Sequence, residues 1–318
     1  MNIQELAALA GVSVSTVSRV FSHHPGIREE SRRKVLALAR EHGYHPRFTA
    51  REKNVVVITP YDSVFPVQSC VDMILMSLAQ ELPRCGFRME ILPVNNLERL
   101  ENIQFCGAAA IGCEAEDFPG WAERFAVPLV IMDRAPRSRI PEQFCFIHSD
   151  EAQGMKLAID HLYARRYRRI GCIIHGTPER GNALTRRRAI TETLRRHGQD
   201  DEKLIHYSGD GDEKYVELIG RLLKNGVDAL FCPGGNAGIL ALYACSLFGR
   251  NVPDDVSLIS SEQTAFSMYT VPPLTTISPD YPGLAHEFCA VLTTWMENNR
   301  LKREVSLPYR LITRESCR

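Results

Sequence analysis

The start of this chain constrains its fold more than any other stretch, because two short amphipathic segments flank a glycine. In the first segment, apolar residues recur at helical spacing: Ile3, Leu6, Leu9 and Ala10. In the second, the apolar residues are Val17, Val20 and Phe21. Between the segments, Gly11 can take the left-handed conformation that ends a helix, and Ser13 can cap the next helix with its hydroxyl. The pattern predicts a helix-turn-helix, a unit that places its second helix in the major groove of DNA.

The opposite face of the second helix carries small and hydroxyl side chains and one arginine: Val14, Ser15, Thr16, Ser18, Arg19 and Ser22. Small residues let a helix enter a groove, and hydroxyls can bond phosphates or base edges. Arg19 can pair with a guanine through two hydrogen bonds. An ordinary solvated helical hairpin is the alternative that this short pair leaves open.

A third helix completes a small basic module. Glu29 and Glu30 open it, which suits the helix dipole, and Gly43-Tyr44-His45-Pro46 closes it. Residues 1–53 hold nine Lys and Arg against five Asp and Glu, whereas the whole chain of 318 residues has a net charge of zero. A basic end on a slightly acidic body is typical of phosphate binding at that end.

These residues carry a resemblance to a known family. The runs Ala10–Ser13 and Thr16–Val20 resemble the headpiece of the LacI/GalR family of bacterial transcription regulators, and Tyr44 falls within that family's Tyr-x-Pro before its hinge. The resemblance implies a helix-turn-helix headpiece over residues 1–46 and a hinge over 47–54. It implies base reading by Val14, Ser15 and Arg19, and phosphate or groove contacts by Thr16, Ser18 and Ser22. Linker cations would add DNA contacts: Arg47, Arg51 and Lys53.

The hinge departs from the family pattern. Lys53 stands where family members place a leucine that wedges into the minor groove, and the linker is several residues short. A lysine cannot unstack bases as an apolar wedge does, although it can contact the backbone or the groove. Either the DNA is bent less or the protein docks differently, with Phe48 as a conceivable substitute wedge.

From residue 54 onward the pattern changes to alternating strands and helices. Apolar runs such as 55–59 and 170–174 read as strands buried on both faces, and helical stretches such as 70–84 and 186–197 separate them. Regular alternation of this kind predicts parallel sheets with helices on both faces. The length of the region predicts two such lobes rather than one sheet.

The body also follows the family's order. Val130–Arg134, His148–Gly154, Val252–Ile259 and Leu311–Cys317 each resemble a family segment. The resemblance implies an α/β fold: a two-lobed periplasmic-binding-protein-like body over residues 55–318, with a small effector between the lobes. The N-lobe is expected at about 55–158 plus 279–300, and the C-lobe at about 159–278 plus 304–318.

Five residues are the candidates for effector contacts: Tyr61, Phe65, Asp133, Arg186 and Glu262. They follow strands or begin a helix, where parallel sheets bind ligands. The resemblance implies that Arg186 reaches the effector, where a guanidinium could fork onto hydroxyls or a carboxylate. A solvated basic run is the alternative for Arg186, and a loop cap is the alternative for Asp133.

Several family positions are changed in this region. Gly234-Gly235 replaces an Asn-Asp pair and so deletes an acid, and Ser260-Ser261-Glu262 replaces a Gly-aromatic-Asp run. Aromatic stacking on a sugar would fall to Tyr61 or Phe65. These changes leave the identity of the effector open.

Other chemistries find little support in the sequence. The ten cysteines include no Cys-x-x-Cys, and no Cys/His cluster has the spacing of zinc ligands, so no metal is expected. No phosphate loop or nucleophile elbow appears, so neither a catalytic residue nor a cofactor is expected. No signal peptide or membrane-length apolar run is visible, which predicts a cytoplasmic protein without a membrane partner.

The sequence therefore predicts a DNA-binding transcriptional regulator, a repressor of a carbohydrate-related operon controlled by a small effector such as a sugar. A homodimer would read a near-palindromic double-stranded operator. A cytoplasmic sugar-binding or sensor protein with weak or no specific DNA binding is the alternative.

Overall fold

The computed structural model describes residues 1–21, 26–44, 53–60, 70–179, 181–209, 214–261 and 265–318. The chain divides into two compact units. The described residues of the first unit fall within Met1–Pro66, Ile74–His148 and Pro282–Val305, and those of the second within Val67–Met73, Ser149–Tyr281 and Ser306–Arg318. Among the described residues, no helix combines the length and apolar composition needed to cross a bilayer.

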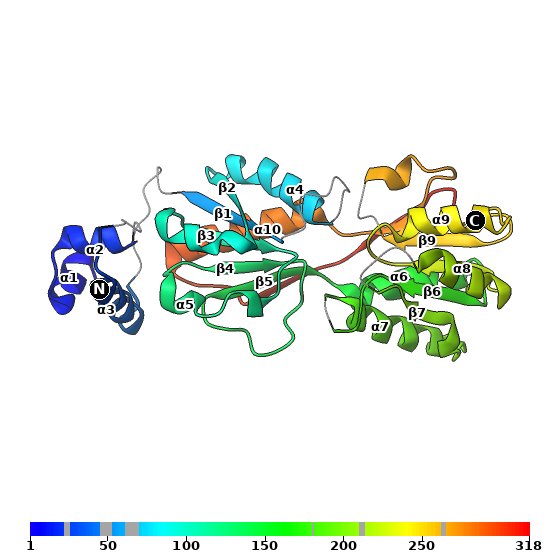
Figure 1. Cartoon of the computed structure of the whole chain (residues 1–318), viewed down its shortest axis with the longest axis horizontal. Coiled ribbons are helices and arrows are strands. Elements are labelled where there is room, and N and C mark those ends of the chain that lie inside the picture. The colour runs from blue at the N-terminus through cyan, green and yellow to red at the C-terminus, as the bar shows by residue number, and fades with distance from the viewer. Residues whose placement is uncertain (22–25, 45–52, 61–69, 180, 210–213, 262–264) are drawn as a thin grey trace. The chain divides into compact units, whose positions relative to one another are not determined.

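Three helices form the amino-terminal part of the chain (Figure 1): α1 (Ile3–Ala10), α2 (Val14–Phe21) and α3 (Glu29–Glu41). Gly11 ends α1 with φ at +67°, as predicted. The Ser13 hydroxyl accepts a hydrogen bond of 3.1 Å from the Thr16 amide, which confirms the predicted cap of α2. A capping box of Asn2 and Glu5 at the start of α1 was not predicted.

The core of this module closes around Tyr44. Its ring lies 5.5 Å from that of Phe21, centroid to centroid, and it is buried together with apolar residues of all three helices. The predicted apolar stripe of α1 is wrong at Leu9, whose side chain is exposed, whereas Ala7 is buried. The helix turns its Leu6, Ala7 and Ala10 face inward because α2 and α3 both pack on that side.

The first unit also contains a six-stranded sheet in the order β11-β5-β4-β3-β1-β2. Its strands are β1 (Asn54–Thr59), β2 (Arg88–Pro93), β3 (Gly107–Ile111), β4 (Leu129–Met132), β5 (Phe144–Ser149) and β11 (Glu304–Leu307). Its helices are α4 (Cys70–Arg84), α5 (Trp121–Arg124) and α10 (Tyr281–Asn298), with short 3-10 turns at Val94–Asn102 and Ala115–Asp117. Gly107 of β3 lets α10 approach closely, since a Cβ there would lie 2.5 Å from Leu292.

The second unit also contains a six-stranded sheet, in the order β12-β10-β9-β8-β6-β7. Its strands are β6 (Ile170–Ile174), β7 (Ile205–Tyr207), β8 (Ala229–Cys232), β9 (Ser257–Ser261), β10 (Thr275–Ser278) and β12 (Arg310–Ile312). Its helices are α6 (Glu151–Ala164), α7 (Ala183–Arg196), α8 (Tyr215–Lys224) and α9 (Ala237–Leu247), with short 3-10 turns at Glu202–Leu204 and Ala265–Met268. The apolar clusters show that α6 and α7 cover one face of the sheet and α8 and α9 the other.

Both sheets are parallel in their interior, as predicted, and β12 pairs antiparallel with β10 at an edge. The predicted lobe boundary at about residue 158 cuts through α6, whereas all of α6 belongs to the second unit. The reason is packing: Met155, Ala158, Ile159 and Leu162 of this helix share one core with α7 and the second sheet.

Eight of the cysteines are buried within these cores: Cys106, Cys113, Cys145, Cys172, Cys232, Cys245, Cys289 and Cys317. Burial raises the pKa of the Cys113 thiol to about 12, so the reactive thiolate is scarce at neutral pH. These thiols therefore serve as small apolar side chains.

Candidate DNA-reading helix and effector-binding residues

Helix α2 presents a polar face that is accessible to a large partner. Val14, Ser15, Ser18 and Arg19 are exposed, while Val17, Val20 and Phe21 are buried between α2 and the other two helices. This alternation follows from the helical period, which puts positions three and four apart on one face. Thr16, which is half-buried, holds the first turn through its hydroxyl, 2.8 Å from that of Ser13.

The remaining predicted DNA contacts are not brought together with α2 by the described structure. Ser22, Arg47 and Arg51 lie outside the described residues. Lys53 is described: its ammonium lies 5.7 Å from the centroid of the Phe87 ring, and its carbonyl accepts the Arg88 amide at the start of the first sheet. The DNA contact of Lys53 stays a prediction, whereas its observed contact is with an aromatic ring of the body.

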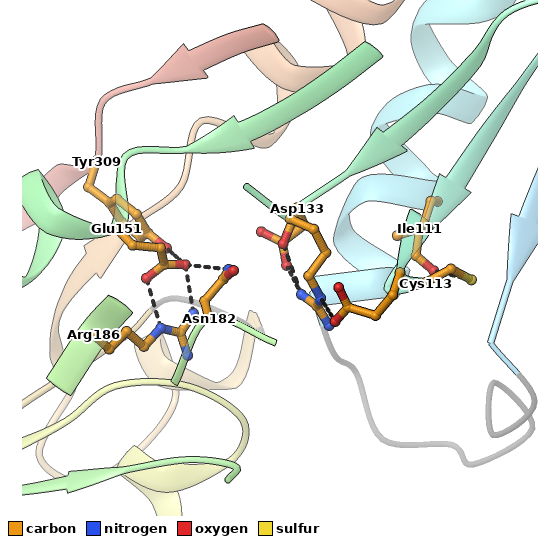
Figure 2. Close-up of polar contacts among 9 residues, drawn as sticks. Ile111, Cys113, Asp133, Glu151, Asn182, Arg186 and Tyr309 are labelled. Atoms are coloured by element: carbon orange, nitrogen blue, oxygen red, sulfur yellow. Dashed lines mark hydrogen bonds and ion pairs between the residues drawn. The ribbon is translucent and has the colours of Figure 1, made fainter. Parts of the chain in front are cut away.

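The predicted effector arginine belongs to a buried polar cluster of the second unit (Figure 2). Arg186 lies in the first turns of α7, and its guanidinium grips the carboxylate of Glu151 at the start of α6. The two bonds run from Nε to Oε2 at 2.7 Å and from Nη2 to Oε1 at 2.8 Å. Arg186 is 7% exposed and Glu151 is 4% exposed, so the alternative of a solvated basic run is wrong for Arg186.

Glu151 was not among the predicted site residues, although it lies within the His148–Gly154 run that resembles a family segment. The neighbouring Asp150 is the N-cap of α6, and its side chain accepts the Gln153 amide at 3.0 Å. A signal was present: an acid in the first turn of a helix, where the dipole favours negative charge. Only the tertiary structure shows that this acid is buried and faces an arginine 35 positions away.

Gly234 and Gly235, which stand after β8 in place of the family's Asn-Asp pair, lie where a larger residue would clash with its neighbours. A Cβ on Gly234 would lie 2.5 Å from Arg186 Nη1, and one on Gly235 would lie 2.9 Å from His175 Nδ1. Both glycines have positive φ, at +98° and +50°. The two glycines therefore make room for Arg186 and His175 at the carboxyl ends of β6 and β8.

Ser261 places a hydroxyl at the same carboxyl-terminal edge of the second sheet. It is the last residue of β9, it is 6% exposed, and its hydroxyl has no hydrogen-bond partner among the described residues. Because strand residues alternate between faces, Ser261 shares its face with Ile259, which packs with α6 and α7. Glu262, the predicted effector acid that follows, lies outside the described residues, as do Tyr61 and Phe65.

Asp133 lies in the first unit, directly after β4 (Figure 2). Its backbone is left-handed, with φ at +62°, and its side chain is buried. Arg134 bridges two carboxylates there, with Nη1 3.5 Å from Asp133 Oδ2 and Nε 3.4 Å from Glu114 Oε1. The role of Asp133 toward an effector stays a prediction, and so does the alternative of a loop cap.

The described residues hold no group of three or more His, Cys, Asp or Glu arranged to bind a metal ion. The two clusters can form hydrogen bonds and ion pairs with a ligand. They offer a charged pair, a hydroxyl and an acid held by arginine, all at the carboxyl ends of strands where parallel sheets bind ligands.

Comparison with known proteins identifies both the amino-terminal helical module and the second unit. Residues 2–47 match the model for bacterial regulatory proteins of the lacI family, and residues 159–317 match a periplasmic binding protein-like domain. A curated relative, the HTH-type transcriptional regulator DegA of Bacillus subtilis, is 26% identical over 99% of this chain and 97% of its own length. The regulator CelR of Thermobifida fusca is 24% identical over 98% of this chain and 94% of its own length.

Solved structures agree on the fold. A structure of the transcriptional regulator CelR with cellobiose matches with a TM-score of 0.73 at 24% identity, covering 99% of both chains. The lac repressor dimer bound to operator and an anti-inducer matches with a TM-score of 0.68 at 21% identity, covering 99% of this chain and 98% of that one. Together with the exposed polar face of α2, these matches show that the chain belongs to the lacI family of bacterial regulatory proteins and is a DNA-binding transcriptional regulator.

Proposed function

We propose that this regulator is a repressor that binds its operator through α2 and responds to a carbohydrate effector. The observation that carries the DNA-binding part is the exposed, hydroxyl-rich face of α2, on which Arg19 is also exposed, while the apolar face is buried. Residues of these types can read base edges in a major groove, and the linker cations would add phosphate contacts.

The carbohydrate part rests on the second unit. Hydroxyl-bearing ligands suit a site with an arginine fork, a buried serine hydroxyl and a glycine pair at the carboxyl ends of strands. The CelR structure that resembles this chain is a complex with cellobiose, which favours the same class of ligand. We propose Arg186, Asp133 and Glu262 as effector contacts, with Tyr61 or Phe65 supplying an aromatic face.

A homodimer is the proposed working state. Two headpieces would read two half-sites of a near-palindromic operator. The second unit exposes large apolar side chains that a second copy could bury, on α9 and beyond β9: Tyr243, Leu247, Phe248, Phe266, Met268, Tyr269 and Val271. Exposed apolar surface of this kind marks an interaction site. Acting on genomic DNA, the regulator would work in the cytoplasm, and it would not be an enzyme.

The test is selection of binding sites from random duplex DNA, followed by titration of the selected site against a scrambled one at several salt concentrations. A regulator of this kind selects a sequence with two-fold symmetry, and its affinity falls steeply as salt rises because bound counterions are released. Equal binding to both duplexes at every salt concentration would contradict the proposal. It would favour a sugar-binding protein without specific DNA recognition.

A further inference from the structure

The ion pair of Arg186 and Glu151 is supported by two further hydrogen bonds to the carboxylate. Besides the arginine, Glu151 Oε1 accepts a hydrogen bond of 2.9 Å from Asn182 Nδ2 and one of 3.0 Å from the Tyr309 hydroxyl (Figure 2). The donors come from the residue before α7, from α7 itself and from the segment before β12. Glu151 is thus fixed from three places in the second unit.

The charge of Arg186 is compensated inside the protein. Burial alone raises the pKa of Glu151, but the Arg186 charge and the hydrogen bonds from Arg186, Tyr309 and Asn182 outweigh burial and hold that pKa below its ordinary value. The carboxylate is therefore ionised at neutral pH, and the pair carries no net charge. The Nε and Nη2 edge of the guanidinium, one of the edges that a ligand carboxylate or phosphate would grip, is occupied by Glu151.

Binding of an anionic ligand to Arg186 would be unfavourable because of the neighbouring Glu151 carboxylate. A second carboxylate or a phosphate on Arg186 would lie beside the buried Glu151 carboxylate, and like charges that share a buried site disfavour each other strongly. A hydroxyl faces no such penalty, because it can donate to Glu151 and accept from Arg186. The nearby Ser261 hydroxyl is likewise neutral and can both donate and accept.

We infer that Glu151 is a positioning and specificity-determining residue: it fixes the Arg186 guanidinium, cancels its charge, and so restricts this site to uncharged, hydroxyl-bearing ligands. The inference rests on the proposed role of Arg186 as an effector contact. It goes further, because it assigns Glu151 a role and excludes carboxylates and phosphates as the group that Arg186 binds.

The decisive variant is Glu151→Gln, which keeps the shape of the side chain and an acceptor oxygen but leaves Arg186 uncompensated. The matched control is Asp160→Asn, which removes the same charge from the exposed end of the same helix, where Asp160 pairs with Lys156 and His197. The probe is inorganic phosphate, titrated against the full-length protein with sodium chloride of equal ionic strength as the reference. The readout is the melting temperature.

We expect phosphate to raise the melting temperature of the Glu151→Gln protein by at least about 2 °C over chloride, since a ligand that binds only the folded state stabilises it. The wild type and the Asp160→Asn protein should respond alike to phosphate and chloride. The double variant Glu151→Gln/Arg186→Gln should lose the phosphate response, which assigns it to the guanidinium.

Two results would overturn the inference. One is a wild-type protein that phosphate stabilises beyond chloride, with the effect lost in an Arg186→Gln variant. This comparison does not depend on whether Glu151→Gln folds. The other is a folded Glu151→Gln protein that does not respond to phosphate. Selection of an operator by the wild type, measured separately, tests the proposed function, so the two can fail independently.

Discussion

The Tyr309 hydroxyl donates a hydrogen bond of 3.0 Å to Glu151 although 158 positions of sequence separate the two residues. The segment that carries Tyr309 follows β11 of the first unit, and Glu151 opens α6 of the second. The Tyr309 backbone amide also donates to the side chain of Gln153, at 2.8 Å. The segment at residue 309 is thus fastened to the first turn of α6, beside the arginine proposed to bind effector.

Removing the hydroxyl of Tyr309 should weaken the fold measurably. In Tyr309→Phe, a buried carboxylate loses one of its donors, so we expect the free energy of unfolding to fall by about 1–3 kcal/mol. Urea titration followed by circular dichroism measures it. The control is Tyr207→Phe, at a half-buried tyrosine at the end of β7, outside the proposed dimer surface. A Tyr309→Phe protein as stable as that control would show that the hydrogen bond contributes nothing.

Enlarging Gly154 should weaken the contact between α6 and the residue 309 segment through a steric clash rather than a lost hydrogen bond. A Cβ there would lie 2.6 Å from the Tyr309 ring, so Gly154→Ala overpacks α6 against the residue 309 segment. We expect a loss of about 1–3 kcal/mol despite the better helix propensity of alanine. Lys156→Ala, at an exposed position of α6, is the control and should change the free energy of unfolding little. Stabilisation of the Gly154→Ala protein would contradict the close approach.

The pair of Glu151 and Arg186 should give stability a defined pH dependence. The folded pKa of Glu151 lies below its ordinary value of 4.5, so the unfolded chain takes up the proton first as the pH falls. The stability from ionised Glu151 is fully present above pH 4.5 and is lost as the pH falls through the folded pKa. The difference in unfolding free energy between the wild type and Glu151→Gln should therefore shrink below that pH. Denaturant titrations across the acid range measure it, and a constant difference would exclude this account.

Arg19 offers the sharpest test of the DNA-reading helix. If its guanidinium pairs with a base, Arg19→Ala should cost about 1–3 kcal/mol of operator affinity and relax the preference at one base pair of each half-site. The control is Arg33→Ala, which removes the same charge from α3, where Arg33 forms an exposed ion pair with Glu29. Fluorescence anisotropy on the selected operator and on single-base variants measures both effects. An unchanged base preference in Arg19→Ala would remove Arg19 from the recognition surface.

The aromatic pair in the headpiece core should couple folding to DNA binding. Tyr44→Ala removes a large side chain that packs on Phe21, in a module with a thin core, so we expect α1 to α3 to lose about 3–5 kcal/mol of stability. Hydrogen exchange should then accelerate in these helices and remain slow in the two sheets, with loss of operator binding. Met76→Ala, at an exposed position of α4 outside the proposed dimer surface, is the control. Uniformly accelerated exchange would show that the headpiece core does not fold separately from the body.

The sequence alone determined the features that rest on local patterns. The glycine after α1, the serine that caps α2 and the alternating strands and helices of the body are set by backbone conformation and side-chain periodicity within a few residues. The same local patterns carried the family resemblance, which the lacI family model confirms for residues 2–47. Leu9 shows the limit, because which of two apolar faces is buried depends on where other helices pack.

Only the tertiary structure decided which residues contact one another in the candidate site. The sequence placed Arg186 at the start of a helix, but it could not show that Glu151, Asn182 and Tyr309 meet there. It also could not show that Gly234 leaves room for the guanidinium. The physical reason is that a buried charge is stable only with a partner, and that partner is supplied by chain topology rather than by neighbours in sequence.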